Sequence, residues 1–226
     1  MCGRFTLKTP RRFEVPTDSE LPPATLLARY NIAPSQEILA ITQSDDERRL
    51  APYVWGLIPS WSEEPKGYIN ARSETLEVKR SFQESFESRR CLIPADGFYE
   101  WERRGKSKQP HYFQMKDESP FAFAGIWDRW RRDGNTITSC SIITTVANEL
   151  LATIHDRMPV ILTPDAGEQW LRDDRPEFLM DLLVPFPARG MKSFPVSTKV
   201  NYAKIDEPSL VEPVEIVEEP ENLRLF

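Results

Sequence analysis

Twenty prolines divide the 226-residue chain into short segments, and this feature limits its fold more than any other. A proline inside a helix removes a backbone donor, so many short strands are favoured over a helical bundle. The segments between the prolines are rich in β-branched and aromatic residues, which favour extended structure. Predicted strands cover residues 38–42, 53–58, 98–101, 112–115, 121–127, 137–145 and 160–162.

Two hairpin signals connect these strands. The segment RRGKSKQP separates FYEWE from HYFQM, and RRDGN contains Asp133, Gly134 and Asn135, which tolerate the positive φ of a tight turn. Helical patterns cover only residues 74–86, 147–154, 163–171 and 178–183. The pattern predicts a single α+β domain with a mostly antiparallel, barrel-like β-sheet flanked by short helices.

Charge divides the chain into two regions. Residues 206–226 hold seven acids and one arginine, whereas the whole chain holds 35 acids and 29 bases, which leaves 28 of each in residues 1–205. The net charge of −6 therefore belongs to the C-terminal end. We expect a neutral domain over residues 1–205, followed by an acidic Pro/Glu-rich tail over 206–226 that is disordered or extended along the domain.

Several protein classes are disfavoured. No apolar run approaches the roughly 18 residues that span a bilayer, and the N-terminus lacks the pattern of a signal peptide. We therefore expect a soluble cytoplasmic protein, associated with the nucleoid if it is bacterial. The three cysteines, Cys2, Cys91 and Cys140, form no C-x-x-C pair, and His111 and His155 are the only histidines. We predict no disulfide framework, no metal site and no cofactor.

The chain begins MCGRF, with a cysteine directly behind the initiator methionine. Because cysteine is small, an aminopeptidase is expected to remove Met1 and leave Cys2 with both a thiol and a free α-amine. Such an amine has an unperturbed pKa of roughly 7.7 to 8.0, so it is far more nucleophilic near neutral pH than lysine. Two nucleophiles on adjacent carbons suit an N-terminal nucleophile or a reagent that condenses with an aldehyde into a five-membered ring. On this pentapeptide alone, a position without chemistry is equally compatible.

Three further stretches place polar residues among apolar ones. In INARSET, Asn70 precedes a predicted helix start, where it or Ser73 could simply be a cap. In ADGFYEW, Glu100 lies among aromatic residues, which favours desolvation, a raised pKa and proton transfer, although a half-exposed strand residue paired with arginine fits equally. In TIHDRMPV, His155 lies at a corner between two apolar segments, where a structural histidine is the ordinary alternative. The aromatic and proline stretches RYNIAPS and WGLIPSWS could be loop ends or a stacking platform for bases.

Together these motifs carry a family resemblance. In order over residues 1–198, MCGRF, RYNIAPS, WGLIPSW, INARSET, ADGFYEW and IHDRMPV resemble the SRAP (SOS-response-associated peptidase) family. The resemblance implies a single α+β domain around a barrel-like sheet. It also implies covalent capture of abasic sites in single-stranded DNA, in which the N-terminal cysteine forms a thiazolidine with the ring-opened sugar aldehyde. The implied partner is single-stranded DNA with abasic sites, and we expect a monomer.

The resemblance also implies roles for particular residues. Cys2 would be the covalent residue, Asn70 and His155 would flank the sugar, and Glu100 would transfer protons. The implied phosphate contacts are Arg4, Arg72 and Arg157, and the implied groups lining the strand are Asn31, Pro34 and Trp61. Ser62 departs from the family pattern, because some members carry a second tryptophan there, and the acidic tail has no assigned counterpart.

Two alternatives belong to other functional classes. A cysteine autopeptidase or hydrolase would use Cys2 as the nucleophile on an acyl group, Glu100 or His155 as the base and Asn70 as an oxyanion donor. A non-covalent binding module for single-stranded DNA would need no chemistry at Cys2. Loss of all covalent product in Cys2→Ala distinguishes capture from the binding module.

Overall fold

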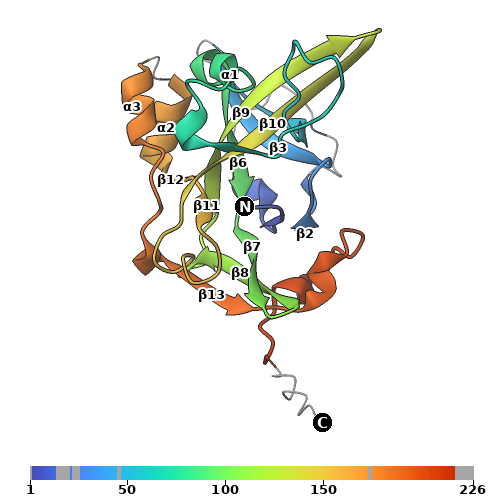
Figure 1. Ribbon diagram of the computed structural model, residues 1–226, viewed down its shortest axis with the longest axis vertical. Helices are drawn as coiled ribbons and strands as arrows, with labels where there is room; N and C mark the ends of the chain where they lie inside the picture. Colours follow the sequence, from blue (N-terminus) through green and yellow to red (C-terminus); the bar gives the residue numbers. More distant parts are fainter. Residues whose placement is uncertain (1, 14–20, 22–25, 45–46, 173–174, 217–226) are drawn as a thin grey trace, which may run out of the picture.

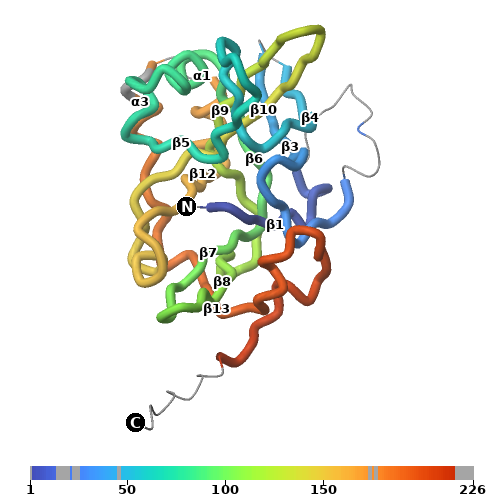
Figure 2. The backbone as a smooth tube through the Cα atoms, turned by 45° about the vertical axis from the view of Figure 1, so that its right-hand side comes forward, coloured from blue at the N-terminus to red at the C-terminus, as the bar shows by residue number. Residues whose placement is uncertain are grey.

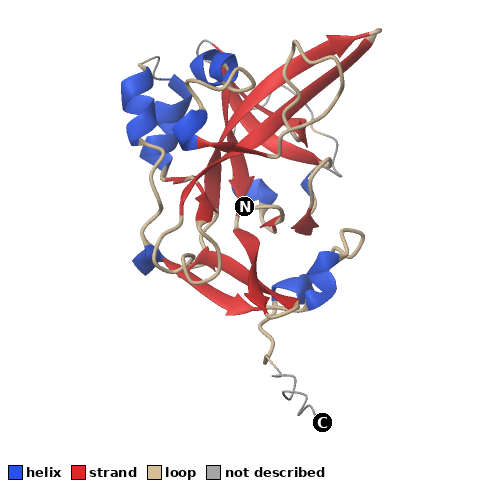
Figure 3. Cartoon of the chain, in the orientation of Figure 1, coloured by secondary structure: helices blue, strands red, loops and turns tan. Residues whose placement is uncertain are grey.

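The computed structural model describes residues 2–13, 21, 26–44, 47–172 and 175–216, and within them the strands form two sheets (Figures 1 and 3). The first sheet has the order β13 (Met191–Pro195), β8 (Ser107–Met115), β7 (Gly97–Arg104), β1 (Phe5–Leu7) and β2 (Arg29–Ile32). The second has the order β11 (Arg157–Pro159), β10 (Asn135–Val146), β4 (Glu47–Trp55), β3 (Glu37–Ser44), β6 (Arg90–Ala95), β9 (Phe121–Arg132) and β12 (Ile161–Leu162).

The second sheet closes on itself. Strand β9 pairs with β10 as well as with β6, so β10, β4, β3, β6 and β9 form a closed five-stranded barrel. Most pairings are antiparallel, but β4 and the short β5 (Asn70–Arg72) both run parallel to β10. The predicted α+β fold with a mostly antiparallel, barrel-like sheet is therefore confirmed. Among the described residues, no helix combines the length and apolar character that crossing a membrane requires.

Both predicted hairpins are present. The β7–β8 hairpin turns at Gly105, which has φ +56, and the β9–β10 hairpin turns through Asp133 and Gly134, with φ +51 and +78. These positive values explain why the sequence supplies glycine and aspartate there. The strand predicted over residues 53–58 instead ends at Trp55, because Gly56 has φ +139 and leaves the strand conformation.

The helix predictions were correct only in part. Helices α2 (Pro164–Arg172) and α3 (Pro176–Asp181) match the predictions for 163–171 and 178–183. The continuous helix predicted over 74–86 was wrong, because that stretch holds a 3₁₀ turn, further turns and only the short α1 (Gln83–Ser88). Leu76 and Phe82 are both buried but six residues apart, a spacing that puts them on different faces of a helix with about 3.6 residues per turn.

The helix predicted over 147–154 was also wrong. The Ala147 N–H donates to the Asp156 carbonyl (3.0 Å), which closes the β10–β11 loop at its base. The enclosed residues form consecutive turns, in which Asn148 Oδ1 accepts from the Leu151 N–H (3.0 Å). The closure between Ala147 and Asp156 fixes both ends of the segment, so its backbone follows the loop in place of a regular helix.

Part of the predicted acidic tail is folded. Its described residues, 206–216, include the 3₁₀ turn Pro208–Val211, and Leu210 is fully buried in a cluster with Tyr99, Tyr112, Val196 and Val200. Residues 217–226 lie outside the described residues, and the boundary at 205 stays a prediction. The acidic segment therefore begins by covering the first sheet.

Gly97 of β7 lies directly against the side chain of Tyr112, a residue of β8. A Cβ atom at Gly97 would lie 2.0 Å from the Tyr112 hydroxyl, which is itself held 2.8 Å from Thr6 Oγ1. We expect Gly97→Ala to lower the free energy of unfolding by about 1–3 kcal/mol, measured by urea denaturation. Gly167→Ala in α2 is the control: its Cβ would meet only the end of Leu92 at 3.2 Å, and alanine favours the helix, so a change below about 1 kcal/mol is expected. Equal stability of Gly97→Ala and wild type would contradict this packing.

Candidate active site

The N-terminal strand lies in the middle of the molecule and carries Cys2 to the candidate site (Figures 1 and 2). Phe5 pairs with Phe98 across β1 and β7, and the Tyr99 N–H donates to the Arg4 carbonyl at 3.0 Å. Because of this pairing, the residues that precede β1 lie beside the middle of β7. Cys2 is therefore brought close to Glu100, whose carboxylate acts electrostatically on the Cys2 thiol.

Asn70 also holds Cys2, through a side-chain hydrogen bond. Strand β5 places Asn70 opposite Ile142 of β10, and the Asn70 Nδ2 atom donates to the Cys2 carbonyl at 2.9 Å. The Asn70 Oδ1 atom is buried and has no hydrogen-bond partner among the described residues. Asn70 thus fixes the backbone of Cys2 with one end of its amide and keeps an acceptor available at the other.

Glu100 is a buried carboxyl, with 2% of its surface exposed. Burial raises its pKa, because the charged form loses water, and the positive charge that His155 can carry partly offsets the rise. The pKa of the Cys2 thiol is also raised, first by complete burial and then by the Glu100 carboxylate. The contact from Cys2 Sγ to the Arg4 carbonyl, at 3.8 Å, is a weak hydrogen bond. Both groups therefore favour their protonated forms.

His155 comes from the loop between β10 and β11. The Arg157 N–H donates to its Nδ1 atom at 3.0 Å, which places the proton of the neutral ring on Nε2. Asp156 Oδ1 lies 2.9 Å from the same nitrogen, a contact that needs a protonated Nδ1. The Asp156 side chain is 86% exposed and therefore free to move, whereas the Arg157 N–H is fixed within β11. The hydrogen bond from Arg157 therefore determines the tautomer of the neutral His155 ring. The electrostatic effect of His155 on Glu100 places both residues in one site.

Three of the residues proposed to contact DNA are bound by the protein itself. Asn31 is buried, and its Nδ2 atom donates to the carbonyls of Val200 (3.2 Å), Tyr202 (3.1 Å) and Ile205 (2.7 Å). The Arg4 guanidinium donates to Asn31 Oδ1 (2.7 Å) and to the Val200 carbonyl (2.6 Å). These contacts join the N-terminal strand to the loop that follows β13.

Arg157 is also committed to internal contacts. It is buried, donates to both carboxylate oxygens of Glu74 and reaches the Thr144 carbonyl at 2.7 Å. Arg72, in contrast, is exposed and forms no ion pair with any described residue, while Pro34 is half-buried. Trp61 is 46% exposed, and the Arg80 guanidinium lies 4.3 Å from the centre of its ring. Of the six residues, Arg72, Pro34 and Trp61 therefore remain at the surface for a ligand.

Sequence reasoning missed Asp206, which it assigned to the tail. Its carboxylate accepts from the backbone N–H groups of Tyr30 (2.5 Å) and Asn31 (3.1 Å), at the edge of β2. Arg29 lies 3.8 Å away and completes an ion pair. No local sequence signal reveals this contact, because 175 residues separate Asp206 from Asn31.

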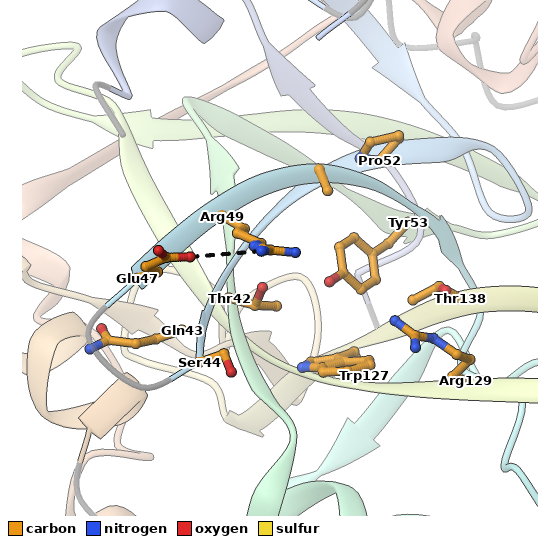
Figure 4. A pocket seen from close by; sticks show the side chains of 11 residues that line it. Thr42, Gln43, Ser44, Glu47, Arg49, Pro52, Tyr53, Trp127, Arg129 and Thr138 are labelled. Carbon is orange, nitrogen blue, oxygen red and sulfur yellow. Dashed lines mark ion pairs between the residues drawn. The ribbon is translucent and has the colours of Figure 1, made fainter. Parts of the chain in front are cut away.

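A separate groove lies between strands β3 and β4 and the β9–β10 hairpin (Figure 4). Its lining residues are Thr42, Gln43, Ser44, Glu47, Arg49, Ala51, Pro52, Tyr53, Trp127, Arg129 and Thr138. It forms where β4, which pairs with β10 only at Val54 and Trp55, separates from the β9–β10 hairpin. None of the predicted site residues lines this groove.

Comparison with known proteins identifies the family. Residues 1–203 match the family described as SOS response associated peptidase (SRAP). The chain belongs to this family. The predicted resemblance is thereby confirmed, and the match covers every residue of the candidate site.

Relatives of the same family extend over most of the chain. The abasic site processing protein YoqW of Bacillus subtilis is 45% identical over 224 residues, covering 94% of this chain and 99% of that protein. The abasic site processing protein YedK of Escherichia coli is 31% identical and covers 95% of this chain and 100% of its own length. The crystal structure of a protein from Bacteroides thetaiotaomicron has a TM-score of 0.85, at 29% identity over 95% of this chain and 100% of that one.

Replacing Asn31 tests whether its role is internal. We expect Asn31→Ala to lower the free energy of unfolding by about 2–3 kcal/mol in urea, because it removes the side-chain donor to the Ile205 carbonyl and the Oδ1 acceptor of the Arg4 guanidinium. Arg72→Gln is the contrast, since Arg72 is exposed and has no ion pair among the described residues, so its stability should stay within about 0.5 kcal/mol of wild type. An Asn31→Ala protein of wild-type stability that had lost DNA affinity would support a direct DNA contact instead.

The raised pKa of Glu100 predicts a pH-dependent stability. The folded protein keeps the Glu100 proton at pH values where the unfolded chain, with a pKa of about 4.3, has lost it, so stability falls as pH rises through this window. The gain in free energy of unfolding of Glu100→Gln over wild type should therefore be absent at acidic pH. It should grow with pH until the pKa of Glu100 in the folded protein is passed, as measured by urea denaturation at several pH values.

Glu102→Gln, on the same strand, is the matched control for this measurement. The pKa of Glu102 is lowered by its hydrogen bonds, first to Arg104 and then to His111. Its charged form contributes stability above the unfolded pKa, so Glu102→Gln should lose stability relative to wild type as pH rises. Equal pH dependence of the two variants would contradict the assigned environments.

Proposed function

We propose that this protein captures abasic sites in single-stranded DNA by a covalent bond to Cys2. Its relatives YoqW and YedK are named abasic site processing proteins. The observation that carries the proposal is the grouping of buried Cys2 and Glu100 with half-buried Asn70, in which a 1,2-aminothiol stands beside a carboxyl with a raised pKa. Removal of Met1 is required, because only then is the Cys2 nitrogen an amine instead of an amide.

The proposed reaction begins at the sugar aldehyde. The Cys2 amine adds to the aldehyde carbon and forms a carbinolamine. Protonated Glu100 gives its proton to the carbinolamine hydroxyl, water leaves, and a cationic iminium remains beside the Glu100 carboxylate. The thiol then adds to the iminium carbon, its proton passes to Glu100, and the ring closes to a thiazolidine. The proton taken from Glu100 is thus returned, and water is the only product released.

Asn70 and His155 support these steps from fixed positions. The Asn70 amide holds the Cys2 carbonyl, so the amine and the thiol of one residue stay oriented for two successive additions to one carbon. His155 carries its neutral-state proton on Nε2 and can exchange a proton with the sugar oxygen, which promotes opening of the sugar to its aldehyde. Its charge also limits how far the pKa of Glu100 rises.

The state of the thiol favours capture over hydrolysis. A cysteine hydrolase attacks an acyl carbon as the thiolate, which neighbouring cations usually stabilise. Here burial and the Glu100 carboxylate raise the pKa of the Cys2 thiol, so the thiolate is disfavoured. An iminium is a stronger electrophile than an amide, and its formation leaves Glu100 charged and ready to accept the thiol proton.

A denaturing gel tests the proposal. Protein with a confirmed Cys2 terminus is mixed with single-stranded DNA that carries one abasic site, with intact DNA as the control. We expect a heat-stable shifted band that requires the lesion, and a rate of band formation that falls roughly 10²–10⁴-fold in Glu100→Gln. No band from wild type, although mass spectrometry shows free Cys2, would reject capture.

The variant Cys2→Ala separates the two nucleophiles. It keeps the α-amine but lacks the thiol, so it can form the imine but cannot close the ring. We expect no heat-stable band without reductant and a band after borohydride adds hydride to the imine carbon. A heat-stable band from Cys2→Ala without borohydride would show that the thiol is unnecessary, and the absence of any band with borohydride would contradict attack by the amine first.

A further inference from the structure

An ion pair between Glu74 and Arg157 joins two segments of the candidate site. Glu74 follows β5, the strand that carries Asn70. Arg157 begins β11 and comes two residues after His155. The Arg157 guanidinium donates to both carboxylate oxygens of Glu74, from Nη1 to one and from Nη2 to the other at 2.9 Å. A two-point contact of this kind fixes the orientation of the guanidinium as well as its position.

The same guanidinium also contacts β10. Its Nη2 atom donates to the Thr144 carbonyl at 2.7 Å, and Thr144 pairs with Arg72 at the end of β5. The Arg157 side chain is 11% exposed, so these contacts are largely shielded from water. The hydrogen bonds from Arg157 are the main reason why the pKa of Glu74 is lowered, so Glu74 is charged and the pair is formed at neutral pH. Three segments of the chain therefore meet at one planar group.

The backbone N–H of Arg157 lies outside the hydrogen-bond ladder between β10 and β11. The Ala147 N–H donates to the Asp156 carbonyl at 3.0 Å. Hydrogen-bonded positions alternate along an antiparallel pair, so the N–H of Arg157, next to Asp156, points away from β10. It donates instead to His155 Nδ1 at 3.0 Å. The ladder alone therefore does not fix this donor, and the anchored Arg157 side chain contributes to its direction.

We propose that Glu74 is a positioning residue for His155 and acts through Arg157. With the ion pair formed, the Arg157 N–H stays directed at His155 Nδ1, and the proton of the neutral ring stays on Nε2. In the proposed function this proton is the one exchanged with the sugar oxygen. The inference therefore rests on the proposed function for its link to the reaction.

Loss of the Glu74 carboxylate changes the contacts of Arg157 and then those of His155. The guanidinium retains Thr144 but loses its only carboxylate partner among the described residues. A buried cation without its counter-charge is unfavourable, so the guanidinium turns toward water and the backbone of Arg157 moves with it. Asp156 Oδ1, 2.9 Å from His155 Nδ1, then replaces the Arg157 N–H, which requires that Nδ1 carries the proton. The neutral ring is then protonated on Nδ1 instead of Nε2.

A purely structural ion pair would behave differently. Its loss would lower the free energy of unfolding without selecting a tautomer of His155. The protonation of the two ring nitrogens is therefore the property to measure. It is measured in the free protein, without DNA, so the result does not depend on whether capture occurs.

Nitrogen-15 NMR of the histidine rings tests the proposal, because the chemical shift distinguishes a protonated from an unprotonated ring nitrogen. His111 is the only other histidine, so the spectrum of His111→Gln assigns the signals of His155. We expect neutral His155 of the wild type to carry its proton on Nε2. In Glu74→Gln the ratio of the Nε2-protonated to the Nδ1-protonated form should fall roughly tenfold, the change that the loss of one hydrogen bond produces.

Two further variants make the result specific. Arg157→Lys keeps the positive charge but lacks the planar fork, so it should shift the ratio as Glu74→Gln does. Glu77→Gln is the matched control, because Glu77 lies in the same segment, is exposed and forms no ion pair with any described residue, so its ratio should equal that of the wild type. A wild-type ratio in Glu74→Gln or in Arg157→Lys, or an equal shift in Glu77→Gln, would overturn the proposal.

The rate of capture is the second measurement. At saturating protein, the heat-stable band from an abasic-site oligonucleotide should form roughly 10- to 100-fold more slowly with Glu74→Gln than with wild type, because proton exchange at the sugar is misdirected. Glu77→Gln should react at the wild-type rate. A shifted tautomer with an unchanged rate would overturn the link to the reaction. Absence of the band from the wild type would reject capture and leave the tautomer result intact, so the two failures are distinguishable.

Discussion

The pairing of β1 with β7 is the interaction on which the site depends. It continues beyond the strand through the hydrogen bond from the Tyr99 N–H to the Arg4 carbonyl. The ring of Phe5 anchors this pairing in the core, where it packs edge-on against Trp55 (5.2 Å) and Phe123 (5.7 Å). Chain termini are usually loosely held, but here burial of Phe5 fixes the residues just before it. Cys2, three residues before Phe5, is thereby held in the interior beside β7.

The two ends of the domain are also joined by buried polar contacts. The Asn31 side-chain amide donates to carbonyls of the loop after β13, and the Arg4 guanidinium links that loop to the N-terminal strand. A buried network of this kind has to be satisfied completely, because each unpaired group costs free energy. This requirement explains why buried Asn31 and half-buried Arg4, polar residues in motifs suggestive of DNA contact, bond to the protein itself. Arg72, in contrast, is exposed.

Sequence patterns predicted the parts of this structure that are local. Turn chemistry at Asp133 and Gly134 located a hairpin, and the run of aromatics around Glu100 indicated a desolvated carboxyl. What could not be predicted depends on contacts between distant segments. The parallel pairing of β5 with β10, which brings Asn70 to Cys2, and the contact of Asp206 with β2 leave no periodic signal. The false helix over 74–86 has the same cause, since tertiary packing of Leu76 and Phe82 overrode local propensity.

The candidate site combines two groups with raised pKa values, the Cys2 thiol and the Glu100 carboxyl. The proposed chemistry gives both of these protonated groups a use. Because burial raises the pKa of Glu100, its charged form destabilises the folded protein at neutral pH. The charged Glu100 carboxylate also raises the pKa of the Cys2 thiol and so disfavours the thiolate. In the proposed reaction the carboxyl ionises only when a cationic iminium forms next to it, so its charge is compensated at once. The same event creates the base that the thiol needs. A site tuned for a permanent thiolate would need a cation beside Cys2, and that cation would oppose the iminium on which ring closure depends.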